Sequence, residues 1–178
     1  FKNLLAKQSC YQTMSGRRIS DVDWTTWLPV DRATLVFVIR KGQILLIRKK
    51  RGLGAGKISG PGGRLEPDES FPACAVREVR EELGVEVSEL VQVGEHRFQF
   101  TDAHSIHVHV YRTHKIDGVP IETDEAVPLW FSLNEIPFDE MWEDDKHWLP
   151  LVVQSKRFSG DWLLDGDQIV DYRLDLLE

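Results

Sequence analysis

The sequence predicts an α/β protein in which a mixed β-sheet lies between helices. Three observations support this prediction: several runs alternate apolar and polar residues with a period of two, one segment carries a clear helical pattern, and strand pairs interleave with helices without regular βαβ alternation. The chain has 178 residues, a length that suits one domain with one core. We expect an N-terminal extension over residues 1–30 and a folded domain over residues 31–178.

The first strands are expected at residues 34–39 and 43–48, joined by a hairpin at Lys41 and Gly42. Period-two alternation then predicts strands within residues 95–100 and 105–113. A short strand at 129–132, a second amphipathic helix at 148–158 and a final strand at 169–174 complete the domain.

The extension is of mixed, polar character and contains Trp24 and Trp27. We expect these two side chains to pack on the domain surface or on a second copy, because large aromatic side chains mainly contribute buried area. It lacks the apolar core of a secretory signal, and no run approaches the roughly 20 apolar residues that cross a membrane. The only cysteines are Cys10 and Cys74, so no disulfide framework is expected. We therefore expect no membrane partner and a reducing, cytoplasmic setting.

The most informative stretch runs from Gly63 to Val85 and reads GRLEPDESFPACAVREVREELGV. It predicts a helix over residues 71–83, with Ser70 as N-cap and Gly84 as the left-handed residue that ends it. Arg77 is placed to brace Glu69 or a neighbouring carboxylate. The glycines before the helix permit close approach of the backbone to a ligand.

Three carboxylates, those of Glu78, Glu81 and Glu82, fall on one face of this helix, beside its apolar stripe. Like charges at these spacings repel, and a divalent cation would remove that cost. Ligands that are all oxygen favour Mg²⁺, with Mn²⁺ possible, and Mg²⁺ commonly bridges carboxylates and substrate phosphates. The predicted substrate is therefore a polyphosphate.

This stretch satisfies G-x5-E-x7-R-E-U-x-E-E-x-G-U, where U is a bulky aliphatic residue, and it resembles the Nudix box. The resemblance implies a Nudix hydrolase with an α/β/α sandwich fold, which cleaves nucleoside diphosphates linked to another moiety. It also implies metal binding by Glu78, Glu81 and Glu82, catalytic roles for Glu81, Glu82 and Arg77, and a metal contact from the carbonyl of Gly62.

Three further segments are similar to the MutT-homologue branch of the family, whose members hydrolyse oxidised purine nucleoside triphosphates. They read KKRGLGAGKISGPGG, IETDEAVPLWFSLNEIPFDEMWEDD and KRFSGDWLLDGDQIVDYRL. This resemblance implies that Trp142, Asp144 and Asp145 read the purine, and that Thr34, Lys49 and Phe98 line the pocket. It also implies that Glu125 reaches the metal site as a ligand or as the general base.

The chemistry of the purine-reading residues is consistent with that role. An indole can stack on a purine for about 1 to 3 kcal/mol. Two adjacent buried carboxyls should raise one pKa, so that one group donates a hydrogen bond while the other accepts one. Without the resemblance, the simpler interpretation is that Glu143, Asp144 and Asp145 cap the helix near Trp148.

Two positions depart from the family pattern. Ser59 replaces an asparagine that reads the purine edge, and Leu53 replaces a phenylalanine of the glycine loop. A hydroxyl offers fewer hydrogen bonds than an amide, so selectivity for 8-oxoguanine could fall or shift toward 2-oxo-adenine or ordinary purines.

The predicted reaction is Mg²⁺-dependent hydrolysis of purine nucleoside triphosphates such as 8-oxo-dGTP or 2-oxo-dATP to the monophosphate and pyrophosphate. Alternatives are dinucleoside polyphosphates, RNA 5′-triphosphate ends, or a nucleotide-binding module without catalysis. The net charge of −7 argues against a duplex nucleic-acid partner. A monomer and a homodimer are both compatible with the sequence.

His104, His107, His109 and His114 raise one further alternative, a transition-metal site, since His107 and His109 share a strand face. With no cysteine nearby and no helical H-x3-H pair, a polar outer face is the simpler interpretation.

Overall fold

The computed structural model describes residues 18–178. Two α-helices, α1 (Phe71–Leu83) and α2 (Asp145–Val153), and two 3-10 helices, η1 (Ile19–Asp21) and η2 (Phe138–Glu140), accompany ten strands. The strands are β1 (Asp31–Arg40), β2 (Gln43–Lys49), β3 (Ile58–Ser59), β4 (Glu86–Ser88), β5 (Val91–Phe100), β6 (Ser105–Thr113), β7 (Lys115–Asp117), β8 (Ala126–Ser132), β9 (Arg157–Asp165) and β10 (Gln168–Leu177).

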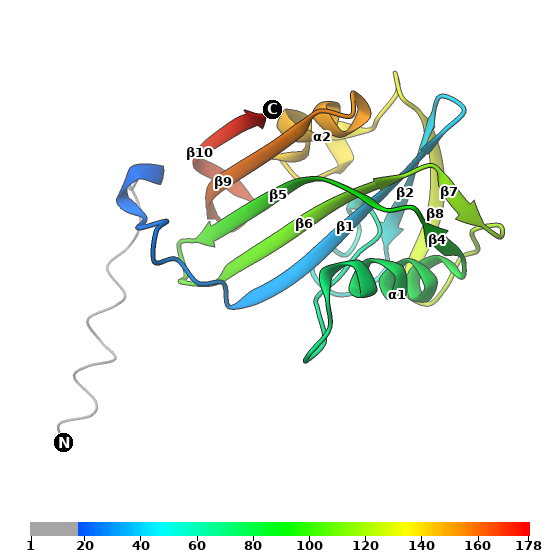
Figure 1. The fold of residues 1–178 in the computed structure, drawn as a ribbon, viewed down its shortest axis with the longest axis horizontal. Coiled ribbons are helices and arrows are strands. Elements are labelled where there is room, and N and C mark those ends of the chain that lie inside the picture. The colour runs from blue at the N-terminus through cyan, green and yellow to red at the C-terminus, as the bar shows by residue number, and fades with distance from the viewer. Residues whose placement is uncertain (1–17) are drawn as a thin grey trace.

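Eight strands form one sheet in the order β10-β9-β5-β6-β1-β2-β3, with β8 paired to β2. The pairs β1/β6 and β5/β9 are parallel and the others are antiparallel, so the predicted mixed sheet is confirmed. Strands β4 and β7 form a separate small ribbon. Figure 1 shows α1 and α2 on opposite sides of the main sheet.

Alternation along β1 explains why both faces of the sheet carry a helix. Val36 and Val38 belong to the apolar cluster that includes the buried face of α1. Phe37 and Ile39 point the other way, into the cluster that includes Trp148 of α2. The predicted α/β/α sandwich is therefore confirmed.

Helix α1 has the predicted ends. The Ser70 hydroxyl accepts a hydrogen bond from the backbone N–H of Ala73 at 3.3 Å, and Gly84 has a φ of 67° while its N–H donates to the carbonyl of Arg80. The hairpin residues Lys41 and Gly42 both have positive φ, as a tight two-residue turn requires.

The second helix was predicted wrongly. It spans Asp145–Val153 rather than residues 148–158, and the residues after it turn into β9. Residues 160–164 of β9 are buried on both faces. Such a strand shows no alternation, and an apolar run of this kind cannot be assigned by periodicity alone.

The tryptophans of the extension pack on the domain, which confirms one of the two expectations for them. The Arg97 guanidinium lies 4.7 Å from the ring centroid of Trp24, and the indole N–H of Trp27 donates to Gln99 at 2.9 Å. Cys10 lies outside the described residues, whereas Cys74 is fully buried. Among the described helices, none is both long and apolar enough to cross a membrane.

Candidate active site

The glycine loop before α1 brings backbone and carboxylates unusually close. A Cβ atom on Gly63 would lie 2.4 Å from the carboxylate of Glu78, and one on Gly62 would lie 2.0 Å from the carbonyl oxygen of Thr34. Only glycine fits at both positions. The loop can therefore lie directly against the acidic face of α1.

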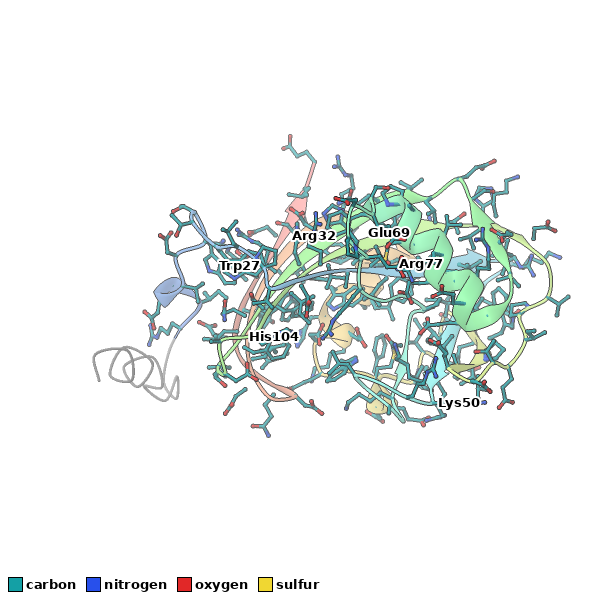
Figure 2. The ribbon with its side chains drawn as sticks, turned by 90° about the horizontal axis from the view of Figure 1, so that it is seen from below. Trp27, Arg32, Lys50, Glu69, Arg77 and His104 are labelled. Carbon is teal, nitrogen blue, oxygen red and sulfur yellow. The ribbon has the colours of Figure 1, made fainter. Side chains whose placement is uncertain are left out.

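Arg77 braces three carboxylates, as the sequence predicted for at least one. Its Nε and Nη2 atoms donate to the two oxygens of Glu69 at 2.8 Å, and Nη1 donates to Glu78 at 2.8 Å and Glu81 at 3.0 Å. Figure 2 shows Glu69 and Arg77 side by side. The hydrogen bonds from Arg77 lower the pKa of Glu69 to about 2.

The other carboxylates of this face are buried to different degrees. The Glu82 side chain is 1% exposed and that of Glu81 is 50% exposed. Burial raises the pKa of Glu82 to about 7, against the opposing effects of Lys49 Nζ at 3.3 Å and the Gly62 N–H at 2.8 Å. Burial also raises the pKa of Glu78, which Arg77 opposes.

These three carboxylates fit a divalent cation. All of their donor atoms are oxygens, and burial makes the negative charge of Glu78 and Glu82 costly without a cationic partner. Arg77 and Lys49 offset part of that cost. A hard divalent ion would offset the rest of the cost of burying these charges, and such ions accept oxygen ligands.

Glu125 lies on a loop that is fastened to the same helix. The hydroxyl of Thr123 donates to the carbonyl of Glu82 at 2.9 Å and accepts from the Glu125 N–H at 3.2 Å. The Glu125 carboxylate itself forms an ion pair with Arg51, a partner that the sequence did not predict. The loop therefore holds the backbone of Glu125 close to α1, while its carboxylate is paired with Arg51.

One cavity of about 1100 Å³ extends from this region to an opposite end that is lined by Trp142 and by residues of α2. Of the residues predicted to act in catalysis or bind metal, Gly62, Arg77 and Glu78 line it. All of the residues predicted to bind substrate do so as well: Thr34, Lys49, Leu53, Ser59, Phe98, Trp142, Asp144 and Asp145. Glu81, Glu82 and Glu125 lie outside the lining.

Asp144 and Asp145 are both buried at this opposite end. Asp144 accepts a hydrogen bond from the Trp148 indole N–H at 2.8 Å, and Asp145 accepts one from the backbone N–H of Trp142 at 3.1 Å. Burial raises both pKa values, and the charge of Asp144 raises that of Asp145 further. Although Asp144 occupies the N-cap position of α2, its side chain makes no capping hydrogen bond, so the capping interpretation is wrong for it.

Lys57 contacts both Trp142 and Asp167, and sequence reasoning missed Lys57 and Asp167. The Lys57 ammonium lies 4.8 Å from the centroid of the Trp142 ring, and 3.5 Å from a carboxylate oxygen of Asp167. The position of Lys57 within the glycine-rich segment was the only available signal. Asp167, in the β9–β10 turn, gave none.

The two residues that depart from the family pattern occupy different surroundings. Ser59 is 8% exposed within β3, whereas the Leu53 side chain lies on an exposed loop at 63%. Ser59 can therefore contact a ligand deep in the cavity, while Leu53 can contact one only at the mouth. Thr34 is buried, and its hydroxyl lies 3.5 Å from the Cys74 sulfur.

An acidic, all-oxygen group of side chains on α1 lies beside a cavity that also holds an aromatic side chain and two buried carboxyls. This is the arrangement expected of a metal-dependent hydrolase of phosphate anhydrides.

Comparison with known proteins gives the family. The model of the NUDIX domain matches residues 29–152, and the chain belongs to the Nudix hydrolase family, whose members generally use a divalent metal ion. The chain is 43% identical over 147 residues to the oxidized purine nucleoside triphosphate hydrolase of Danio rerio, covering 82% of this chain and 94% of the relative. It is 40% identical over 143 residues to the enzyme of the same description from Mus musculus, covering 79% and 92%.

The fold is also similar to a solved structure. A mutator MutT protein from Bacillus halodurans superposes with a TM-score of 0.74 at 25% sequence identity, covering 82% of this chain and 98% of that protein. The order of the strands and the placement of α1 are thus those of a Nudix hydrolase.

Proposed function

We propose that this enzyme hydrolyses purine nucleoside triphosphates with oxidised bases, such as 8-oxo-dGTP or 2-oxo-dATP, to the monophosphate and pyrophosphate. One observation carries the proposal: a single cavity is lined both by Glu78 of α1 and by the Asp144–Asp145 pair beside Trp142. The two curated relatives described above carry this substrate class in their names.

Mg²⁺ is the metal we propose, with Mn²⁺ as a substitute, because oxygen ligands favour hard cations. Glu78, Glu81 and Glu82 would hold it, joined by the carbonyl of Gly62 and by Glu125. When bound, the ion supplies neutralisation of the charge that develops on the phosphate oxygens.

The residues of the chain supply the rest of the reaction. Lys49 lines the cavity next to Glu82 and is placed to bind a phosphate oxygen. Water attacks one of the two phosphorus atoms that flank the α–β bridge, forming one P–O bond while the P–O bond to the bridging oxygen breaks. The proton of the water passes to Glu82 or Glu125. The bridging oxygen leaves with pyrophosphate if the α-phosphorus is attacked and with the nucleoside monophosphate if the β-phosphorus is attacked.

At the other end, Asp144 and Asp145 would read the base edge. Trp148 donates to Asp144 and so favours its ionised form, whereas the pKa of Asp145 is raised further. We therefore assign the proton of the pair to Asp145, which donates to the base while Asp144 accepts. Trp142 would stack on the purine, with Lys57 against its ring.

The proposal is tested by incubating the protein and Mg²⁺ with 8-oxo-dGTP, 2-oxo-dATP, dGTP, ATP, a dinucleoside tetraphosphate and a 5′-triphosphate RNA. We expect the highest kcat/KM with an oxidised purine triphosphate, and monophosphate and pyrophosphate as products. Preferential turnover of the dinucleotide or the RNA would replace the substrate assignment. Absence of turnover with every triphosphate would overturn the proposal and favour a binding module.

A further inference from the structure

Three side chains with metal-binding atoms meet on the face of β6 that points away from the cavity. Ile106 and Val108 line the cavity, so His107 and His109, which alternate with them, lie on the opposite face. Strand β5 runs antiparallel beside them and places Glu95 directly across from His109. One ligand atom from each of Glu95, His107 and His109 lies within 4.8 Å of the others.

The distances within this trio are short. Nε2 of His107 lies 3.0 Å from Oε2 of Glu95, and Nε2 of His109 lies 3.7 Å from the same oxygen. Two ligands bound at 2.0–2.1 Å to one tetrahedral ion are about 3.4 Å apart. Small rotations of the side chains would therefore bring all three atoms to one ion.

This face is not the freely solvated surface that the sequence favoured. The Phe71 ring stacks on His109 with centroids 3.6 Å apart and planes 6° apart, and the Trp27 ring meets His107 edge-on at 6.2 Å. The two imidazoles are consequently held in place, with side-chain exposures of 23% for His107 and 17% for His109. Immobilised ligands lose less entropy when an ion binds.

We propose that Glu95, His107 and His109 form a second metal site, one for a borderline transition-metal ion such as Zn²⁺. Two imidazole nitrogens and one carboxylate oxygen are the ligands that Zn²⁺ accepts with a fourth position open to water. Mg²⁺ favours oxygen ligands and would remain with the carboxylates of α1. The two sites are thus chemically distinct.

The proposed site contacts the catalytic helix, because His109 stacks on Phe71 and Phe71 is the first residue of α1. Its affinity is limited by His109. Nδ1 of His109 is buried and has no hydrogen-bond partner among the described residues, whereas a metal-binding histidine ordinarily donates from its second nitrogen. We expect the missing partner to weaken binding by about ten- to a hundredfold relative to a site with a complete outer shell.

The test is calorimetric titration of the full chain with Zn²⁺ in the presence of excess Mg²⁺, which occupies the oxygen-ligand site. We expect one equivalent of Zn²⁺ to bind the wild type, and His107→Ala and Glu95→Gln each to weaken that binding at least about tenfold, the loss typical when a metal-site group is removed. NMR signals of the His107 and His109 rings should shift with the same Zn²⁺ dependence.

His114→Ala provides the matched control, because His114 is a β6-adjacent histidine whose side chain is 66% exposed and lies 3.8 Å from Glu89. This variant should bind Zn²⁺ as the wild type does. Thermal unfolding shows whether each variant is folded. If His107→Ala does not fold, the Zn²⁺ affinity of Glu95→Gln, which is the mildest change, tests the proposal. Zn²⁺ binding of wild-type strength in folded His107→Ala and Glu95→Gln, or ring signals that do not shift, would overturn the proposal.

Discussion

The α1 end and the Trp142 end of the site both bury carboxylates, but the negative charge of those carboxylates is offset in different ways. At the α1 end, Arg77 and Lys49 lie within 3.3 Å of Glu78 and Glu82 and favour their ionised forms. At the Trp142 end, Asp144 and Asp145 accept hydrogen bonds from neutral N–H groups, and neither has an ion pair among the described residues. A buried carboxyl without a cation responds by taking up a proton.

This difference separates two chemical roles. Carboxylates that lie beside cations, and that a bound metal ion would hold in the ionised form, are suited to phosphate transfer. A carboxyl that carries a proton is suited to donate a hydrogen bond to a base. We therefore expect changes at the α1 end to act on the chemical step and changes at the Trp142 end to act on nucleotide binding.

The largest expected effect is on turnover. Glu81→Gln removes a negative charge from the half-exposed member of the α1 face without disturbing the core. We predict a fall in kcat of about 10²- to 10³-fold, the range for loss of one charge-stabilising group. Steady-state kinetics should show this fall, and Glu86→Gln, which alters an exposed carboxylate paired with Arg80, should leave kcat unchanged. Activity of Glu81→Gln within tenfold of the wild type would refute the metal-ligand role.

The next effect is on stability. Because the pKa of Glu82 is raised to about 7 from 4.5, this group contributes stability that is fully present below pH 4.5 and is lost as the pH rises through 7. The difference corresponds to about 3 kcal/mol. Denaturant unfolding without metal should therefore show the wild type losing stability between pH 5 and 8.

Glu82→Gln should remove this pH dependence, since its side chain cannot ionise. Added Mg²⁺ should restore wild-type stability at pH 8 and have a smaller effect on the variant, because a ligand stabilises only the state that binds it. Parallel pH profiles of the two proteins would show that Glu82 is not the group responsible.

A smaller effect is expected at the purine end. If Asp145 donates through its proton, kcat/KM for an oxidised purine should fall as the pH rises and the carboxyl ionises. In the wild type we expect this fall in kcat/KM to be about tenfold, the effect of losing one hydrogen bond. Asp145→Asn keeps an N–H donor at every pH and should therefore show no such fall. A pH profile that Asp145→Asn leaves unchanged would assign the proton elsewhere.

The smallest predicted effect concerns Ser59. Ser59→Asn adds a second hydrogen-bonding atom in the deep part of the cavity. The ratio of kcat/KM for 8-oxo-dGTP to that for dGTP should rise about fivefold, equivalent to roughly 1 kcal/mol. An unchanged ratio would remove Ser59 from the account of specificity.

The sequence predicted the α1 end almost completely, because its signals are local. Caps, glycines and helical spacing all lie within one stretch, and Arg77 reaches Glu69 only eight positions away. The purine end depended on the family resemblance, since Asp144 and Asp145 look like helix caps until the fold buries them. Contacts between segments distant in the sequence could not be predicted, such as Glu95 across from His109 and Lys57 beside Asp167. The burial of residues 160–164 of β9 on both faces could not be predicted either.

The division of roles is tested most directly by binding of 8-oxo-dGMP, which carries the base without the pyrophosphate, in the absence of metal. We predict that Glu81→Gln binds this nucleotide as tightly as the wild type and that Asp145→Ala binds it about tenfold more weakly, as expected for one lost hydrogen bond. Equal weakening in both variants, or weakening in Glu81→Gln alone, would contradict the assignment of base recognition to the Trp142 end.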